Sequence, residues 1–245
     1  MSFDRSPLAG LGFRPQLWPT VIAIPVFLTL LGLGTWQVFR LTEKEAVNAF
    51  RSERAAAPPV DLAANPAELA PLEFRRLRAR GQFDHGRELY VYGRSQRGNE
   101  GYYILTPLRR DGAPPVLINR GWVPRDRKDP ARRAEGQVAG PVEVVGFLRS
   151  DARRGWLMPE NDVASNHWFW FDLPAMSRAA GLPATAPFYL EADTAPNPGG
   201  FPIGGQTQIQ LPSNHLQYAI TWYVLAVSFA VIYVLWHRRR PVKTP

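Results

Sequence analysis

The sequence predicts two transmembrane α-helices that flank a single β-rich domain, which is either an antiparallel barrel or a small sandwich. Residues 17–39 and 216–236 form two uncharged apolar stretches. Each stretch is long enough for a helix to cross about 30 Å of hydrocarbon. Between them, short runs of β-branched and aromatic residues alternate with turns rich in glycine and proline, as in small all-β domains.

The first apolar stretch is predicted to be a membrane anchor rather than a cleaved signal peptide. It is longer than the roughly 7–15 residues of a signal core, and large residues instead of a small-x-small cleavage site follow it. The chain therefore divides into five parts. They are a cytoplasmic N-terminus (1–16), a first span (17–39), an outer domain with a helical and proline-rich entry (40–212), a second span (213–236) and a basic tail (237–245).

The basic residues around the spans predict their orientation. The tail reads HRRRPVKTP, and the positive-inside rule places such a segment in the cytoplasm. Arg5 and Arg14 precede the first span and agree with this, although Arg40 and Lys44 follow it. With both termini in the cytoplasm, the domain between the spans lies outside. We expect a multi-pass protein of the bacterial inner membrane with a periplasmic domain, or of the mitochondrial inner membrane if the source is eukaryotic.

The net charge limits the kinds of partner that the chain can bind, and the absence of cysteine limits its chemistry. The net charge is +8, but an exported domain between two spans would not meet nucleic acid. The lipid bilayer, with its acidic head groups, or an anionic ligand is a better partner for this charge. Because the chain has no cysteine, it has neither disulfides nor thiolate metal sites.

Within the outer domain, residues 40–56 are predicted to continue the first helix into water, until Pro58, Pro59 and Pro66 break it. Residues 171–181 are predicted to form a short helix that Asp172 and Gly181 cap. The expected strands lie in the runs RELYVYGR, GYYILTPL, PPVLINRGWV, GPVEVVGFL and APFYLEA.

A search for catalytic motifs gives little. The four histidines do not pair at metal-binding spacings, and HExxH, G-x-S-x-G and P-loop motifs are absent. An enzyme is therefore not expected. A cleft that joins His85 or His167 to carboxylates in the folded domain would revive that hypothesis.

The stretch INRGWVPRD is unusual, because Asn119, Arg120, Gly121 and Trp122 crowd the end of a predicted strand. Arginine and tryptophan together can stack on a planar ligand or bind an anion. The alternative is a structural role, in which the strand leaves through a bulge while Asn119 and Arg120 tie down loop backbone.

His215 stands at the first turn of the second span. A neutral histidine at the membrane boundary can be a mere interfacial residue, but its imidazole nitrogen is also a good axial ligand for heme iron. Gly32 and Gly34 near the outer end of the first span would let another helix approach closely. A heme held there would contact candidate pocket residues Trp36, Arg40, Tyr218 and Trp222.

Several stretches, in order, resemble the Surfeit locus protein one family of cytochrome c oxidase assembly factors. They are LGTWQVFRLTEKEAV, FRRLRARGQFDHGRELYV, GYYILTPLRRDG, VLINRGWVPRD and NHLQYAITWY, from about Leu33 to Tyr223. One departure is Ser213, where the resemblance leads us to expect asparagine before NHLQYA.

The resemblance implies a non-enzymatic role in oxidase biogenesis, with His215 as the ligand of heme a that is inserted into the catalytic subunit. It implies structural or assembly roles for the first-span motif that contains Gly34 and Gln37, and for the motif at Asn119, Arg120, Gly121 and Trp122. Expected partners are the oxidase catalytic subunit and heme a synthase. The alternative is a scaffold or chaperone that stabilises an oxidase subunit intermediate without binding heme.

Overall fold

The computed structural model of the chain describes residues 13, 15–63, 69–95, 97–150, 154–182 and 188–238. The chain forms two compact units, Met1–Ala49 together with Leu211–Pro245, and Phe50–Gln210. The first is called the helical unit here and the second the barrel domain. Most of the predicted cytoplasmic N-terminus (1–16) and basic tail (237–245), and Pro66 of the predicted linker, lie outside the described residues.

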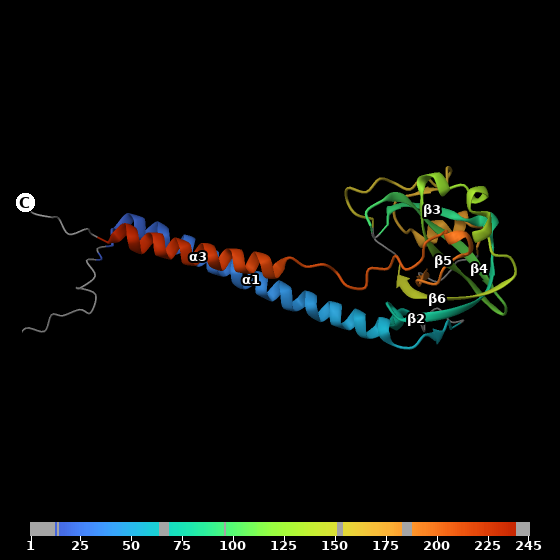
Figure 1. Ribbon diagram of the computed structural model, residues 1–245, viewed down its shortest axis with the longest axis horizontal. Helices are drawn as coiled ribbons and strands as arrows, with labels where there is room; N and C mark the ends of the chain where they lie inside the picture. Colours follow the sequence, from blue (N-terminus) through green and yellow to red (C-terminus); the bar gives the residue numbers. More distant parts are fainter. Residues whose placement is uncertain are drawn as a thin grey trace, which may run out of the picture. The chain divides into compact units, whose positions relative to one another are not determined.

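Two long apolar helices, α1 (Leu17–Ala56) and α3 (His215–His237), run side by side in the helical unit (Figure 1). Both are long and apolar enough to span a membrane. As predicted, α1 continues past the end of the apolar stretch, and it ends at Ala56 before Pro58 and Pro59. Proline lacks the N–H group that an α-helix needs, which explains this end.

The two helices approach closely where their residues are small. Gly34 on α1 is buried, as are Ala219 and Ala226 on α3. A Cβ atom at Gly34 would lie 2.8 Å from the ring of Tyr223, so no larger residue fits there without a shift. A Cβ at Gly32 would meet nothing within 4 Å. The predicted close approach is therefore confirmed at Gly34 and wrong at Gly32, which lies on a different face of the helix.

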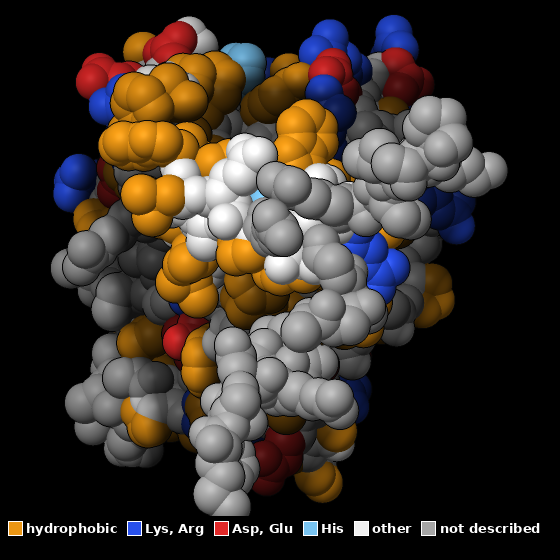
Figure 2. Space-filling view, turned by 90° about the vertical axis from the view of Figure 1, so that its left-hand side faces the viewer, with side chains coloured by type: hydrophobic (Ala, Val, Ile, Leu, Met, Phe, Trp, Pro, Cys, Tyr) orange, Lys and Arg blue, Asp and Glu red, His pale blue; other side chains and the backbone are white. Residues whose placement is uncertain are grey.

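Polar contacts fix the register of α1 against α3. The hydroxyl groups of Thr20 and Tyr233 lie 2.5 Å apart, and the Thr35 Oγ1 atom lies 3.1 Å from the Tyr223 hydroxyl. Many other side chains of the pair are apolar and exposed, among them Ile22, Leu28, Val227 and Leu235. Hydrophobic side chains are also prominent among the described residues in the end-on view of Figure 2. Such apolar surface is unfavourable in water but suits lipid, and it agrees with two membrane spans.

The barrel domain is a closed five-stranded barrel with extra strands, and this confirms the predicted fold class. The barrel strands follow the order β2-β6-β8-β5-β4, and β2 pairs with β4 to close the ring. Their bounds are β2 Arg76–Phe83, β4 Glu100–Arg110, β5 Ala113–Pro124, β6 Pro141–Ser150 and β8 Phe188–Ala192. The additional strands are β1 Val60–Asp61, β3 Leu89–Arg94 and β7 His167–Trp168.

The sequence predicted antiparallel pairing throughout the barrel. This part of the prediction is wrong, because β5 and β8 pair in parallel. Parallel neighbours need a long crossover connection. The chain provides one between Pro124 and Phe188, and it contains β6, β7 and the short helix α2 (Leu173–Ala179). Five short 3-10 helices lie among the described residues of the domain. They are η3 Ala70–Leu72, η4 His85–Arg87, η5 Arg125–Arg127, η6 Pro130–Gly136 and η7 Pro198–Gly200.

Helix α2 covers a second hydrophobic cluster beside the barrel interior. Its predicted caps are confirmed, since the Asp172 side chain accepts a hydrogen bond from the Ala175 N–H and Gly181 adopts a φ of 62°. One cluster fills the barrel with residues such as Leu77, Ile118, Leu148 and Leu190. The other packs Leu105, Leu117, Trp168, Leu173 and Met176 beneath α2.

Candidate functional site

His215 is the first residue of α3, and its ring is tied to the neighbouring helix. The Nδ1 atom lies 2.7 Å from Oε1 of Gln37 on α1. An amide oxygen can only accept, so Nδ1 carries the proton in this arrangement. In the neutral imidazole, the lone pair then lies on Nε2, the nitrogen that points away from Gln37. In this tautomer, His215 therefore has a lone pair on Nε2 that is available to a metal ion.

A second-sphere hydrogen bond of this kind is the usual companion of a metal-binding histidine, because it fixes the orientation of the ring and raises its basicity. Gln37 lies three residues after Gly34, so both are on the face of α1 that contacts α3. The glycine lets the helices approach, and the glutamine uses that approach to hold the histidine. At the helix start, Ser213 Oγ accepts a hydrogen bond from the His215 N–H at 3.4 Å, although Asn214 makes no capping bond with its side chain.

The other candidate pocket residues lie around this histidine with different degrees of exposure. Tyr218 and Trp222 follow His215 by three and seven residues, a spacing that places all three along one side of α3. Tyr218 is 54% exposed and Trp36 is 53% exposed, while Trp222 is half-buried. Arg40 forms an exposed ion pair with Glu43 at 2.6 Å. These aromatic rings are free to meet an apolar ligand, whereas Arg40 would have to leave Glu43 first.

His237, at the other end of α3, offers a comparison. Its Nδ1 atom lies 2.8 Å from the backbone oxygen of Tyr233 in the preceding turn, so its ring is held by its own helix. It borders an apolar groove between the helices, whose other walls include Trp18, Phe229 and Trp236. His237 is 5% exposed, so it is less accessible than the half-buried His215.

The motif at Asn119–Trp122 lies in the barrel domain, where strand β5 contains the predicted bulge. The register between β4 and β5 shifts between Tyr103 and Leu105, opposite Arg120 and Gly121. Gly121 has a φ of 121°, and a Cβ there would lie 2.1 Å from the Ile203 backbone oxygen. Trp122 then pairs through its backbone with Ile203, with N···O distances of 2.9 and 2.8 Å. Glycine is thus required for conformation and for space.

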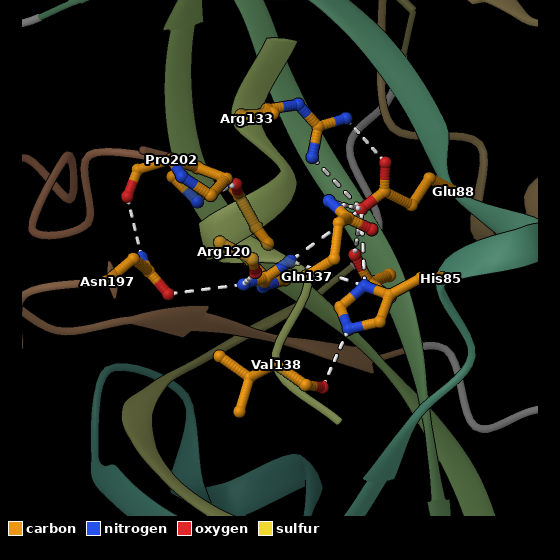
Figure 3. Close-up of polar contacts among 12 residues, drawn as sticks. His85, Glu88, Arg120, Arg133, Gln137, Val138, Asn197 and Pro202 are labelled. Atoms are coloured by element: carbon orange, nitrogen blue, oxygen red, sulfur yellow. Dashed lines mark hydrogen bonds and ion pairs between the residues drawn. The ribbon is translucent and has the colours of Figure 1, made fainter. Parts of the chain in front are cut away.

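Arg120 extends from this bulge into a buried polar cluster (Figure 3). Its guanidinium donates to the Gly136 backbone oxygen and, at 3.2 Å, to Asn197 Oδ1, and it stacks 4.6 Å from the ring centroid of Phe83. Asn197 in turn donates to the Pro202 backbone oxygen at 2.6 Å. Arg120 therefore holds the loops that cross the end of the barrel, as the structural alternative anticipated. With 2% of its surface exposed, it offers little to an external anion or planar ligand.

Glu88 supplies the negative charge of this cluster. Its two carboxylate oxygens lie 3.2 and 2.5 Å from the guanidinium of Arg133, and one of them lies 3.6 Å from Arg120. Burial lowers the pKa of Arg120 to about 10, the Glu88 charge opposes this shift, and the Arg133 charge reinforces it. Two buried cations therefore share one carboxylate.

His85 belongs to the same cluster, but the cluster does not resemble a catalytic cleft. Its Nδ1 lies 3.5 Å from a Glu88 oxygen, and its Nε2 lies 2.9 Å from the Val138 backbone oxygen (Figure 3). Glu88 is 4% exposed and already binds Arg133, so a substrate has no access to this histidine–carboxylate pair. His167 stacks on Phe169 with a centroid distance of 4.8 Å instead. In the described parts of the chain, no three His, Cys, Asp or Glu side chains gather to hold a metal ion.

Sequence reasoning missed Glu88 and Arg133. Both sit among other charged residues, in HGRELYV and DPARRAEG, and nothing in the local pattern separates a buried charge from a solvated one. A weak signal was available, because Glu88 directly precedes the alternating residues of β3.

Comparison with known proteins identifies related chains. The model of the SURF1 family matches residues 24–227. Over 233 residues the chain is 40% identical to Surfeit locus protein 1 of Rattus norvegicus, covering 89% of this chain and 74% of that protein. It is 38% identical over 241 residues to Surfeit locus protein 1 of Homo sapiens, covering 92% and 78% respectively. It is 34% identical over 235 residues to the SURF1-like protein of Monosiga brevicollis, covering 91% and 88%.

Proposed function

Because the chain belongs to the SURF1 family, we propose that it is a membrane-bound assembly factor that holds heme a on His215 for insertion into the catalytic subunit of cytochrome c oxidase. Membership of this family implies a role in cytochrome c oxidase assembly, and the two apolar helices support a membrane protein. Heme binding by His215 and transfer of the heme to the oxidase go beyond that role.

The observation that carries the heme proposal is the hydrogen bond between His215 and Gln37. With Nδ1 donating to Gln37, the neutral imidazole carries its lone pair on Nε2, and this is the form that iron ligation requires. One imidazole suffices to anchor a heme, because the macrocycle supplies the other four nitrogen ligands of the iron. The absence of a multidentate cluster among the described residues is therefore compatible with this cargo.

The surroundings of His215 suit a group that must be released again. Trp36 and Tyr218 are more than half exposed, and aromatic side chains can cover an apolar macrocycle without enclosing it. A bound heme would be held through the Nε2 nitrogen of His215. The protein orients that nitrogen through Gln37 and keeps the site at the end of a helix pair, where a partner protein can reach it.

We further propose that both termini lie in the cytoplasm and that the barrel domain lies on the outer side of the inner membrane. The catalytic subunit of the oxidase would receive the heme, and heme a synthase would deliver it. Heme a, rather than another heme, is inferred from the oxidase role and not from the geometry of His215.

The test is to purify His215→Ala after co-expression with the enzymes that synthesise heme a, and to measure heme per chain from the Soret band. We expect loss of most of the bound heme. His237→Ala is the matched control, since it removes an imidazole from the opposite end of the same helix, and it should retain wild-type stoichiometry. Gln37→Leu should keep the ligand but weaken binding by about 10–100-fold, as expected when a second-sphere partner is lost.

Retention of wild-type heme content by His215→Ala would refute the ligation proposal. The scaffold alternative would then gain support if a deletion strain contained oxidase with normal heme content but reduced subunit association. Either result leaves the family assignment untouched, because that rests on the sequence comparisons.

A further inference from the structure

The barrel domain presents an exposed apolar turn at residues 155–158. The Met158 N–H donates to the Gly155 backbone oxygen at 2.9 Å, which closes a β-turn with Trp156 and Leu157 at its two corner positions. Trp156 is 90% exposed and Leu157 is 76% exposed. Turn corners usually carry Gly, Pro, Asn, Asp or Ser, so two large apolar residues here are contrary to the usual chemistry of a solvated turn.

The exposed apolar residues of the barrel domain concentrate around this turn. Among the described residues of the domain, seven large hydrophobic side chains are exposed, and four of them belong to residues 156–163. The seven are Phe50, Val60, Trp156, Leu157, Met158, Val163 and Ile203. A single exposed apolar residue is ordinary, but three consecutive ones at a turn that includes a tryptophan indicate a binding surface.

The turn is held in shape from within the loop. The Arg154 guanidinium donates through Nε to the Met158 backbone oxygen at 2.9 Å and pairs with Glu160 at 3.0 Å. These bonds join both sides of the turn, so Trp156 and Leu157 are presented without the support of the hydrophobic core. A preorganised tip loses less conformational entropy on binding than a loose loop would.

The chemistry of this tip matches the boundary layer of a lipid bilayer. Tryptophan prefers the head-group region, leucine and methionine gain from contact with acyl chains, and arginine can interact with anionic lipid phosphates. Arg154 adjoins the tip, and it would exchange Glu160 for a phosphate in such a contact.

The connectivity of the chain favours lipid over a soluble partner. The barrel domain is joined at each end to the helical unit, which contains both apolar helices, so it never diffuses away from the membrane that they span. Such a tether makes weak binding intramolecular, and a small apolar tip is then sufficient. We propose that the turn at residues 155–158, with Trp156 and Leu157 at its tip, inserts into the head-group boundary of the bilayer and acts as a third membrane contact of the protein.

The natural absence of cysteine makes a direct test simple. The full-length chain with Met158→Cys carries an environment-sensitive fluorophore and is reconstituted in nanodiscs that contain anionic lipid. We expect a blue-shifted emission and strong quenching by lipids with a nitroxide on the upper acyl chain. Asp111→Cys, in the exposed turn between β4 and β5, is the matched control and should emit as in water without quenching.

A second variant separates insertion from folding. Trp156→Ser with Leu157→Ser, in the Met158→Cys background, should lose the blue shift and quenching while its thermal unfolding is unchanged, because the removed side chains are exposed. Water-like emission of the label at position 158, in nanodiscs that contain the labelled protein but no oxidase, would overturn the proposal. A blue shift that appears only after addition of the oxidase catalytic subunit would also overturn it, in favour of protein docking. Substitution of His215 should not alter the signal, so this test is independent of heme binding.

Discussion

Among single residues, the carboxylate of Glu88 has the most demanding position, because the barrel domain buries it between two guanidinium groups. Arg133 takes both of its oxygens, and Arg120 lies 3.6 Å away on the other side. Ion pairs of this kind contribute little net stability when intact, since desolvation offsets much of the attraction. Removal of one partner is different, because the charges that remain are buried without compensation.

We therefore predict that Glu88→Gln destabilises the barrel domain by about 3–5 kcal/mol. The substitution keeps the size of the side chain but leaves Arg120 and Arg133 in mutual repulsion. Glu143→Gln is the control, because Glu143 is 47% exposed and pairs with Arg78 and Arg80 at the surface, where loss of an ion pair costs about 1 kcal/mol or less. Urea unfolding of the full-length chain, followed by near-ultraviolet circular dichroism, measures both. Equal midpoints for the two variants would show that the buried charge is not structural.

The residue scale also shows what the sequence could not predict. Sequence reasoning selected His215 and, separately, Gln37, but their hydrogen bond depends on how α1 and α3 align. Likewise, Arg120 was selected by its motif, whereas its partner Glu88 looked like any charged residue before a strand. Local patterns identify unusual residues, while pairs that are distant in sequence follow from tertiary packing.

At the scale of elements, the sequence was most informative where one physical constraint dominates. The long apolar runs, the helix breakers at Pro58 and Pro59, and the caps of α2 each gave an element that is observed. The five runs that became β3, β4, β5, β6 and β8 were also recognisable, but β2 was not among the expected strands and the choice between barrel and sandwich stayed open. It depends on the pairing of Gln82 and Phe83 with Arg109 and Leu108, which closes the ring and has no signature in either strand alone.

The contact between α1 and α3 gives a prediction at this scale. Gly34→Val should separate the helices near Tyr223, because a Cβ there would lie 2.8 Å from the tyrosine ring. Gln37 lies one turn along α1, so the hydrogen bond to His215 should be weakened or lost. Nitrogen-15 NMR of labelled histidine in the full-length protein reports this bond, and a protonated Nδ1 of His215 in the wild type should give way to a mixture of tautomers.

Gly32→Val serves as the control for this substitution. It adds the same side chain two residues away, where a Cβ would meet nothing within 4 Å, and the His215 signal should be unchanged. If both variants keep the wild-type tautomer, close packing at Gly34 is not what positions Gln37. If both lose it, the effect reflects valine in the helix rather than contact with Tyr223.

At the scale of the whole molecule, the surfaces of the two units suit different environments, lipid for one and water for the other. The helical unit exposes apolar side chains such as Ile22, Leu216 and Ile232, while the barrel domain closes around a buried core. The first surface is stable in lipid and the second in water. The apolar stretch of α1 ends at Phe39, before the boundary between the two units at Ala49 and Leu211. At that boundary, Asn48 forms two hydrogen bonds with the Leu211 backbone, at 3.0 and 2.9 Å.

This division leads to a prediction about topology that the absence of cysteine makes easy to test. Single cysteines at Ser213 and Thr244 flank α3, which spans His215–His237. In intact cells, or in mitoplasts for a mitochondrial protein, a membrane-impermeant maleimide should label Ser213→Cys. Thr244→Cys should become reactive only after permeabilisation, because the positive-inside rule predicts that the basic tail lies in the cytoplasm or matrix. Labelling with the opposite pattern would place His215 on the inner side of the membrane, where it could not present heme to an outward-facing partner. Labelling of both cysteines in intact membranes would mean that α3 does not span the bilayer, and the proposed site would then lose its membrane boundary.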